Sequence, residues 1–459
     1  MTKKLASIIL AAGKGTRMKS SLPKVLHEMG GLPLLQYPLE IVQNIKSDPI
    51  IIVVGHGSEI VKQRFKKNPK IHYALQKEQL GSAHAVMCAQ QALKNFEGDV
   101  VILSGDVPLL SLQTVEGLLE FHRQKQNVLS LASFRLRKPT GYGRVIRDLA
   151  GEVIKIVEET DLSLEEKSVE EVNGGLYIAR LPLLFKALKK INLNPIKKEY
   201  YFTDLPQVLH QMGYRIGALQ VEDSTELSGV NTRLDLAQAE KYLQKRLYTH
   251  WMLAGVSFIN PDNTHLHSKV KIGFDTILSP AVHLLGNTQI GKKCIIEEGA
   301  VLKDSWVGDG VMIRSYSHLE KCKVEAGAVV GPFARIRPES LIKKNAHVGN
   351  FVELKKSTLG EGSKANHLSY LGDAVIGKEV NIGAGTITCN YDGKKKHKTK
   401  IESGVFIGSD TQLVAPVKIG KNAYVGAGST ITKNIPAQAL ALSRVTQKHI
   451  AGYSKRKKK

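Results

Sequence analysis

The chain has 459 residues, 42% of them hydrophobic and 23% charged, with a formal net charge of +23. That length exceeds an ordinary single domain, and the composition is that of a globular protein rather than a disordered or fibrous one. A positive surplus of this size attracts anions such as nucleic acid, acidic membrane or phosphorylated small molecules.

The four cysteines are scattered along the chain without a CxxC pair, which argues against a zinc site or a disulfide framework. Such cysteines fit a reducing cytoplasm, where we expect this protein to act. Lys3 and Lys4 with the apolar run behind them imitate a signal peptide, but a buried first strand explains the run better. We expect no transmembrane segment, because no stretch approaches the roughly 20 apolar residues that span a bilayer.

The first half of the chain alternates short apolar runs with amphipathic stretches. The apolar runs are residues 6–10, 50–54 and 100–103, and the amphipathic stretches include residues 33–44 and 114–126. This alternation predicts an α/β fold, Rossmann-like, with a mainly parallel sheet between helices. Ligands of such sheets gather at the carboxyl ends of the strands.

A single long helix is predicted over residues 231–253. Leu236, Leu243, Leu247 and Trp251 recur there at helical spacing, with charged residues between them. A helix of this length spans roughly 33 Å. It would link a first domain, residues 1–230, to whatever follows.

Beyond residue 254 the sequence becomes repetitive with a period of six. Such hexads predict a solenoid in which each short strand turns its aliphatic residue inward and successive coils stack. We expect this domain to cover residues 254–450 and to be followed by a basic tail, residues 451–459. The periodic aliphatic residues are Ile290, Ile296, Leu302, Val324, Val330, Ile336, Ile342, Val348, Leu354, Ile401, Ile407, Leu413, Ile419, Val425 and Ile431.

The strongest motif of the first half follows its first apolar run. Residues 10–18 read LAAGKGTRM, and Pro23-Lys24 follows shortly afterwards. Glycines after a buried strand let backbone N–H groups approach phosphate oxygens, while Arg17 and Lys24 supply positive charge to a leaving pyrophosphate. This ordered set differs from the Walker and dinucleotide motifs and resembles the signature of sugar-nucleotide pyrophosphorylases.

The resemblance implies the roles of further residues. Asp106 and Asn231 match the ligands of Mg²⁺, and Arg17 and Lys24 match catalytic positions, in a reaction that joins a sugar-1-phosphate to UTP. Ser82, Ser104 and Gly174 stand where relatives often have Thr, Tyr and Thr. The positions that match the site for the UDP-sugar are Leu10, Ala11, Ala12, Gly13, Lys24, Gln76, Gly81, Ser82, Ser104, Gly105, Asp106, Gly141, Glu158, Asn173 and Asn231.

The repeats resemble the left-handed parallel β-helix of hexapeptide acyltransferases. Four segments narrow the resemblance: residues 331–338 (GPFARIRP), 348–356 (VGNFVELKK), 367–373 (HLSYLGD) and 381–393 (NIGAGTITCNYDG). They look like the acetyltransferase domain of the bifunctional N-acetylglucosamine-1-phosphate uridyltransferase/glucosamine-1-phosphate acetyltransferase family. With the first-half motifs, the resemblance covers nearly the whole chain and implies synthesis of UDP-N-acetylglucosamine, a cell-wall precursor.

The resemblance makes His367 the catalytic base of acetyl transfer. An amine must be neutral to attack a thioester, and imidazole titrates in the range where it can take that proton. Glu353 is expected to orient or polarise the imidazole. Arg337, Lys355, Tyr370 and Asn381 match the site for glucosamine-1-phosphate, and Ala384, Asn390, Tyr391, Ser409, Ala427 and Arg444 match contacts to acetyl-CoA.

Other polar residues of this half carry weaker expectations. The lysines of residues 394–398 are expected in a solvated loop that interrupts the coils, and His265 and His267 are expected to be structural or exposed. By analogy with relatives we expect a homotrimer with acetyl-CoA between neighbouring β-helices. We expect small-molecule substrates and no specific nucleic acid.

Two alternatives remain at this point. The chain could be a monofunctional pyrophosphorylase whose β-helix is regulatory or merely trimerises it, although a passive solenoid needs no such cluster of motifs. It could also be a non-catalytic scaffold or RNA-binding protein that uses its positive charge. That alternative predicts exposed aromatics among the basic residues, and aromatics are only 6% of the chain.

Overall fold

The computed structural model describes residues 4–66 and 68–456, in two compact units, Met1–Leu243 and Gln244–Lys459. Residues 457–459 of the expected basic tail lie outside the described part of the chain.

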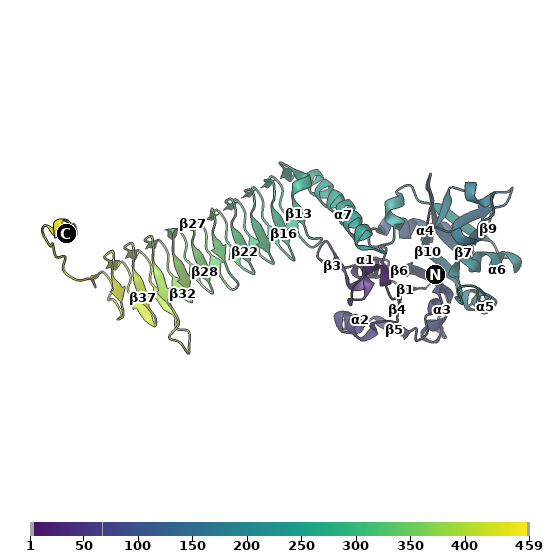
Figure 1. Ribbon diagram of the computed structural model, residues 1–459, viewed down its shortest axis with the longest axis horizontal. Helices are drawn as coiled ribbons and strands as arrows, with labels where there is room; N and C mark the ends of the chain where they lie inside the picture. Colours follow the sequence, from purple (N-terminus) through teal and green to yellow (C-terminus); the bar gives the residue numbers. More distant parts are fainter. Residues whose placement is uncertain (1–3, 67, 457–459) are drawn as a thin grey trace. The chain divides into compact units, whose positions relative to one another are not determined.

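A nine-stranded sheet forms the centre of the first unit (Figure 1). Its main path runs β11-β7-β10-β6-β1-β4-β5, and β8 and β9 join at β10. The strands are β1 (Leu5–Ala11), β4 (Ile50–Val54), β5 (Ile71–Leu75), β6 (Asp99–Ser104), β7 (Leu129–Arg135), β8 (Arg144–Arg147), β9 (Val153–Val157), β10 (Glu171–Arg180) and β11 (Ile216–Gln220). A separate pair is β2 (Glu28–Met29) with β3 (Leu32–Pro33).

Helices cover both faces of this sheet, which is why its central strands are apolar on both sides. All five residues of β4 are buried. Along β1, Ile8 packs into the core on one face and Ile9 into the core on the other. Helices α3 (Ser82–Cys88), α5 (Leu183–Leu188) and α6 (Leu205–Gln211) cover the Ile8 face, and α1 (Gln36–Asn44), α2 (Ser58–Phe65) and α4 (Leu112–Gln124) cover the Ile9 face.

Strand β10 is the antiparallel strand in the main path of a mainly parallel sheet. It lies between β6 and β7 and is antiparallel to both, whereas β1 is parallel to its neighbours β4 and β6. The register of β10 shifts between Asn173 and Tyr177, so the strand bulges there. The prediction of a mainly parallel α/β domain is confirmed.

Helix α7 (Arg233–Leu253) contains the last residues of the first unit and the first residues of the second. The Asp235 carboxylate accepts bonds from the backbone N–H groups of Asn231 (2.9 Å) and Thr232 (2.8 Å), which fixes the start of the helix. In the second unit, the side chain of Gln244 both donates to and accepts from the backbone of Leu266 (2.7 and 3.0 Å).

The second unit is a left-handed parallel β-helix, as predicted, built from three parallel sheets (Figure 1). The first sheet holds β12 (Ser257–Phe258), β15 (Ile277–Leu278), β18 (Ile295–Ile296), β21 (Met312–Ile313), β24 (Val329–Val330), β27 (His347–Asn350), β30 (Lys364–His367), β33 (Asn381–Ile382), β36 (Phe406–Ile407), β39 (Tyr424–Val425) and β41 (Leu440–Ala441). The second sheet holds β13 (His265–Leu266), β16 (His283–Leu285), β19 (Val301–Lys303), β22 (His318–Glu320), β25 (Arg335–Ile336), β28 (Glu353–Lys355), β31 (Tyr370–Gly372), β34 (Ile387–Cys389), β37 (Gln412–Val414) and β40 (Thr430–Ile431). The third sheet holds β14 (Lys271–Ile272), β17 (Gln289–Ile290), β20 (Trp306–Val307), β23 (Lys323–Val324), β26 (Leu341–Ile342), β29 (Thr358–Leu359), β32 (Ala374–Ile376), β35 (Thr399–Ile401) and β38 (Val417–Ile419).

The hexads explain this architecture because each coil places one aliphatic residue per sheet inside the solenoid. Leu302, Leu319, Ile336, Leu354 and Leu371 pair in register on successive coils, and all are fully buried. Successive residues of this column are 17 or 18 positions apart. A coil of 17 residues has one repeat of five residues in place of six, and the stack remains intact.

One loop interrupts the coils between β34 and β35. An antiparallel bridge joins Tyr391 to Lys396, and His397 donates its backbone N–H to Asn390 O (2.8 Å). The Asp392 carboxylate accepts from the backbone N–H groups of Lys394 and Lys395, which lowers the pKa of Asp392. The lysine-rich loop is therefore an ordered hairpin.

The final helix in the described part of the chain is α8 (Tyr453–Arg456). Within that part, no helix is both long enough and apolar enough to cross a membrane.

Candidate active sites

In the first unit, the loop after β1 lies beside the turn after β6. Gly105 N donates to Leu10 O (2.8 Å), so the ends of the two strands stay together. Gly15 adopts a left-handed conformation (φ 61°), and a Cβ there would lie 2.7 Å from Lys24 Cβ. Glycine at this position therefore lets the loop pack against Lys24.

Four predicted residues meet at this edge of the sheet. The Lys24 ammonium contacts Asp106 Oδ2 and lies 3.1 Å from Asn231 Oδ1. Arg17 also donates to Asn231 Oδ1, at 3.0 Å. Val230 N donates to Asp106 O (2.8 Å), which holds the segment before α7 against the turn after β6. The sequence places these residues far apart, and the sheet brings them together.

A second group forms beside the first residues of α3. Gln76 is buried, and its amide donates to Gly81 O (3.0 Å). The Ser82 hydroxyl accepts from Phe202 N (2.9 Å) and so ties α3 to the segment before α6. Because serine keeps this hydroxyl, the Ser82 departure from the family pattern preserves the contact. Gln79, which sequence reasoning missed, donates to Ala12 O (2.6 Å) and steadies the glycine-rich loop.

A third group lies around the bulge of β10. The Glu158 carboxylate accepts from the Thr203 hydroxyl (2.7 Å), and Asn173 Oδ1 accepts from Gly175 N (3.1 Å). Burial, reinforced by the negative charges of Glu158 and Asp161, raises the pKa of Asp204. This group offers carboxylate and amide oxygens, as hydrogen bonding to sugar hydroxyls and an acetamido group requires.

Two of the departures from the family pattern, Gly174 and Ser104, and the expected sugar-site residue Gly141 differ in their surroundings. At Gly174 a Cβ would lie 2.5 Å from Leu227 Cδ1, so the side chain of Leu227 occupies the space that a larger residue at position 174 would need. Gly141 donates its backbone N–H to Glu159 and has a positive φ of 85°. Ser104 ends β6, next to the loop after β1.

In the second unit, His367 ends strand β30, and Asn350 ends the strand paired with it. These two residues are direct partners in the register, and His367 Nδ1 lies 3.1 Å from Asn350 Oδ1. Both line a pocket of about 280 Å³ that also includes Arg314 and His347. Asn350 is the neighbour of the imidazole that sequence reasoning missed; only the pairing of the coils reveals it.

The structure gives Glu353 a different partner from the one expected. Its carboxylate accepts from Arg337 (2.9 Å), and this hydrogen bond raises the pKa of Arg337. Tyr370 follows Glu353 on the next coil of the same sheet. Glu353 therefore contacts the guanidinium of Arg337, and Asn350 is the residue beside the imidazole of His367.

The loop lysines are not all remote from this region. The ammonium group of Lys355 lowers the pKa of Lys396 through close contact and like charge. An anion bound beside two neighbouring ammonium groups reduces the repulsion between them. Lys396 is exposed, as expected for a solvated loop, and its ammonium also lies close to that of Lys355.

The residues expected to contact acetyl-CoA follow one corner of the β-helix. Gly385 N donates to Leu368 O (3.2 Å), Asp410 N to Ala384 O (2.7 Å) and Gly428 N to Ser409 O (2.8 Å). Arg444 then donates to Ala427 O (3.2 Å). His367, Ala384, Ser409, Ala427 and Arg444 therefore succeed one another coil by coil along what we call the corner line.

Asn390 and Tyr391, also expected in the acetyl-CoA site, follow β34 of the second sheet rather than the corner line. Asn390 is buried and donates to Asp373 Oδ2 (2.5 Å), whereas Tyr391 is exposed and donates to Gly393 O (2.7 Å). Asn381 begins β33, the strand paired with β30 that contains His367.

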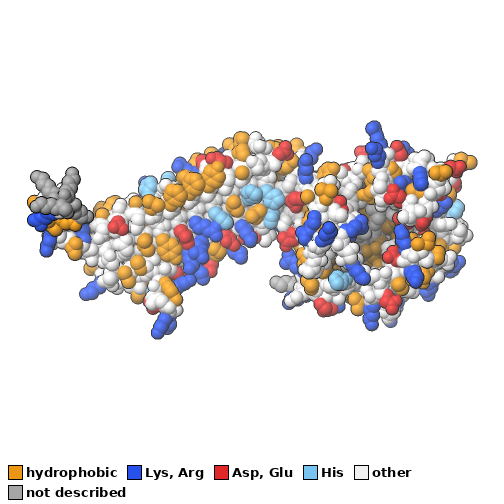
Figure 2. All heavy atoms as spheres, viewed as in Figure 1, with side chains coloured by type: hydrophobic (Ala, Val, Ile, Leu, Met, Phe, Trp, Pro, Cys, Tyr) orange, Lys and Arg blue, Asp and Glu red, His pale blue; other side chains and the backbone are white. Residues whose placement is uncertain are grey.

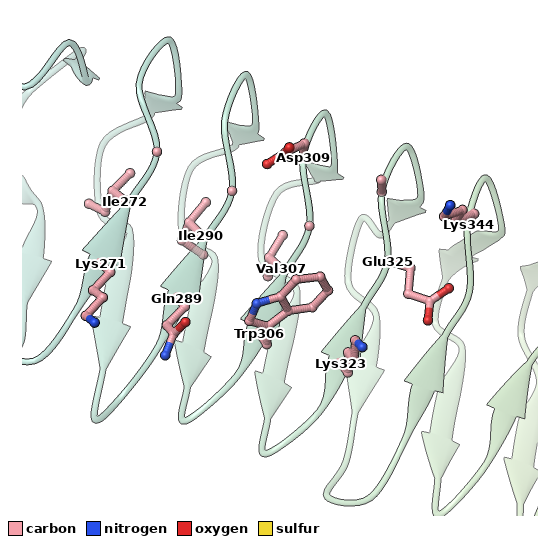
Figure 3. A pocket seen from close by; sticks show the side chains of 14 residues that line it. Lys271, Ile272, Gln289, Ile290, Trp306, Val307, Asp309, Lys323, Glu325 and Lys344 are labelled. Carbon is pink, nitrogen blue, oxygen red and sulfur yellow. The ribbon is translucent and has the colours of Figure 1, made fainter.

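A larger groove of about 580 Å³ lies on the third sheet of the β-helix and contains no candidate site residue (Figure 3). Trp306 faces it, with the ammonium of Lys323 4.7 Å from the ring centre.

The first unit also presents a hollow on its surface (Figure 2). The ring centres of His265 and His283 lie 5.8 Å apart with the rings tilted, and His267 Nδ1 accepts from Gly286 N (2.9 Å). Among the described residues, no three His, Cys, Asp or Glu side chains gather to hold a metal.

Comparison with known proteins gives matches to both halves of the chain. A profile of the nucleotidyl transferase family matches residues 6–251, and one of bacterial transferase hexapeptide repeats matches residues 398–433. The chain is 47% identical to the bifunctional protein GlmU of Pelobacter propionicus over 99% of both chains. It is 46% identical to that of Syntrophotalea carbinolica, over 98% of this chain and 96% of the relative. Identity to that of Streptococcus thermophilus is 43%, over 98% and 97%.

Substitution of Gly349 tests the close approach that aligns His367. A Cβ at position 349 would lie 1.9 Å from Asn366 O, so Gly349→Ala must push β27 and β30 apart. We expect the free energy of unfolding to fall by about 3 kcal/mol, the upper end for overpacking, because the added Cβ would clash with backbone atoms that cannot easily move. Both tryptophans of the chain lie in the second unit, so their fluorescence during urea unfolding reports on that unit.

Gly428→Ala is the matched control. Its φ is +71°, but nothing lies within 4 Å of the added Cβ. Gly428→Ala should lower the free energy of unfolding by about 1 kcal/mol, the cost of an alanine in the left-handed conformation. Equal losses in the two variants would contradict the assigned close approach at Gly349.

Proposed function

This chain belongs to the family of bifunctional GlmU proteins, and from that membership we propose which of its residues carry out the two reactions. It transfers an acetyl group from acetyl-CoA to the amine of glucosamine-1-phosphate and a uridylyl group from UTP to N-acetylglucosamine-1-phosphate. The product, UDP-N-acetylglucosamine, supplies cell-wall synthesis. Identity over the full length to proteins named bifunctional argues against a passive β-helix and against a nucleic-acid scaffold.

The corner line carries the assignment of acetyl transfer. Coils of a parallel β-helix are about 4.8 Å apart, so four steps from His367 to Arg444 cover about 19 Å. An extended pantetheine arm fits such a line. Its thioester would lie at His367 and its phosphates at the Arg444 guanidinium.

His367 is the proposed general base. With Asn350 Oδ1 accepting from Nδ1–H, the other imidazole nitrogen, Nε2, is free to accept a proton. The amine nitrogen attacks the thioester carbon, the C–S bond breaks, and the amine proton passes to Nε2. The same proton then leaves with the CoA thiolate as the thiol.

An anion site beside this line is proposed for the phosphate of glucosamine-1-phosphate. Arg337, held by Glu353, and Lys355 with Lys396 supply its positive charges. Tyr370 and Asn381 would contact the sugar. The contact between Lys355 and Lys396 supports this assignment, because a bound phosphate relieves the repulsion.

Uridylyl transfer is proposed at the carboxyl ends of β1 and β6. A phosphate oxygen of the sugar attacks the α-phosphorus of UTP, and pyrophosphate leaves without a covalent enzyme intermediate. Arg17, Lys24 and the backbone N–H groups from Leu10 to Gly13 would bind the triphosphate. Gln76, Gly81 and Ser82 would contact the base, and Ser104, Gly105, Gly141, Glu158 and Asn173 the ribose and sugar.

The donor set at Asp106 and Asn231 fits Mg²⁺. A carboxylate and an amide oxygen lie close enough to contact the same Lys24 ammonium. Two protein oxygens suit Mg²⁺, which completes its coordination with waters and substrate phosphates. When bound, Mg²⁺ neutralises charge on the triphosphate.

A homotrimer and a cytoplasmic location are also proposed. Ile277, Ile295, Met312 and Val329 pair in register on the first sheet with their side chains at the surface. Ile277 and Ile295 are 37% and 36% exposed, and hydrophobic side chains run along this unit (Figure 2). A second copy of this apolar column would cover it. The four free cysteines and the substrates suit the cytoplasm.

Separate assays of the two reactions test the site assignments. His367→Ala should lower CoA release about 10²- to 10⁴-fold, because the general base is lost. It should leave uridylyl transfer to supplied N-acetylglucosamine-1-phosphate unchanged, and Asp106→Ala should show the reverse. Free CoA and UDP-N-acetylglucosamine are measured in the same preparations. An enzyme whose two activities fall together in either variant would contradict the assignment of independent sites.

The pH dependence of acetyl transfer tests Asn350 as a positioning residue. Asn350→Ala should lower kcat more than it raises KM, because the imidazole loses its orientation. Asn350→Asp restores an acceptor, but its negative charge favours imidazolium and should move the acid limb of the kcat profile to higher pH. Asn366→Ala, on the next coil in the same pocket, is the control. An Asn350→Asp profile that matches wild type would refute the contact.

Light scattering tests the apolar column as the trimer interface. Wild type should have three times the chain mass, and Ile295→Glu should lower the mass because a buried unpaired carboxylate is costly. Ile60→Glu, at an isoleucine 49% exposed on the first unit, should remain a trimer. A monomeric wild type, or a trimeric Ile295→Glu, would refute this interface.

A further inference from the structure

The proposed magnesium ligands already share a cation, the ammonium of Lys24. Lys24 Nζ contacts Asp106 Oδ2 and lies 3.1 Å from Asn231 Oδ1. Arg17 donates to the same amide oxygen at 3.0 Å. The side chains of Lys24 and Asp106 are only 15% and 18% exposed, so solvent screens their attraction little.

Lys24 and a divalent ion cannot occupy this place together. Both would need the Asp106 carboxylate and the Asn231 amide oxygen, and like charges at such separation repel strongly at low dielectric. An Asp106 carboxylate without any cation is also unfavourable, because a mostly buried negative charge would have no compensating positive charge. The site is therefore occupied by one cation or the other.

Lysine is suited to leaving such a place. Its ammonium is a compact charge on a flexible stem, and the loop that carries it also carries phosphate-binding groups. Once displaced from Asp106, the ammonium lies within the same loop cluster as Arg17 and the glycine-rich segment. Triphosphate oxygens then offer it a new counter-charge.

We propose that Lys24 is an internal cation that holds the Asp106–Asn231 pair until nucleotide arrives and that it exchanges there with Mg²⁺. This inference rests on the proposed magnesium site of uridylyl transfer. The exchange makes metal binding and nucleotide binding favour each other. Mg²⁺ displaces the Lys24 ammonium from Asp106, and the displaced ammonium then binds the nucleotide. Bound nucleotide in turn holds the ammonium away from the metal site. Free protein should consequently bind a divalent ion weakly.

The test titrates Mn²⁺ into the full-length protein without nucleotide and measures free Mn²⁺ by electron paramagnetic resonance. Lys24→Met removes the competing charge and should tighten Mn²⁺ binding, by roughly 5- to 150-fold if the coupling has an ordinary size. Lys24→Arg keeps a competing cation and should bind Mn²⁺ as weakly as wild type. Lys19→Met, an exposed lysine of the same loop region, is the charge-matched control and should also match wild type.

Asp106→Asn separates failure of the exchange from failure of the magnesium site. If Asp106→Asn abolishes Mn²⁺ binding while Lys24→Met leaves the affinity unchanged or weaker, the exchange is overturned and the site stands. If Asp106→Asn binds Mn²⁺ as wild type does, the magnesium site and the exchange fall together. Far-UV circular dichroism of every variant should match wild type; acetyl transfer cannot replace this control, because its proposed site lies in the second unit and the substitutions lie in the first.

Discussion

Register between parallel strands is the constraint on which both units depend. In the second unit, each coil gives its backbone hydrogen bonds to the next, so a residue's neighbours lie 17 or 18 positions away in sequence. The inward aliphatic residue of each hexad pins that register, because a slip of one residue would turn it outward. Columns of chemically related side chains, such as the corner line from His367 to Arg444, follow from this stacking.

Excess positive charge is the second property that the two units share. The first unit gathers Arg17 and Lys24 at the Asn231 amide oxygen, with Lys24 also at the Asp106 carboxylate, and the second places Lys355 close to Lys396. In each case, an acidic or amide side chain holds part of the cluster in place, as Glu353 holds Arg337. Both sites therefore favour phosphorylated ligands before any ligand-specific contact is made, and the net charge of +23 reinforces this at longer range.

Much of the fold could be predicted from the sequence, because it rests on local periodicity. The apolar run at residues 50–54 is strand β4, and the helix expected over residues 231–253 is α7, which begins at Arg233. The antiparallel position of β10 could not be predicted, since strand order depends on long-range pairing. The same reason hid the partner of His367: Asn350 is 17 residues away, and only coil register makes it a neighbour. The hairpin that brings Lys396 close to Lys355 could not be predicted, because a run of lysines gives no sign of it.

The two active sites face opposite electrostatic requirements, and their residues differ accordingly. Uridylyl transfer moves charge between phosphates, so permanent cations such as Arg17 and Lys24 suit it at every stage. Acetyl transfer needs a base that is neutral when the amine arrives, and a carboxylate beside His367 would favour the protonated imidazole, which cannot accept a proton. In the proposed arrangement, an amide at position 350 orients the imidazole without adding charge. The negative charge of Glu353 is paired with Arg337. Glu353 can therefore hold the proposed phosphate-binding cation without favouring the protonated form of His367.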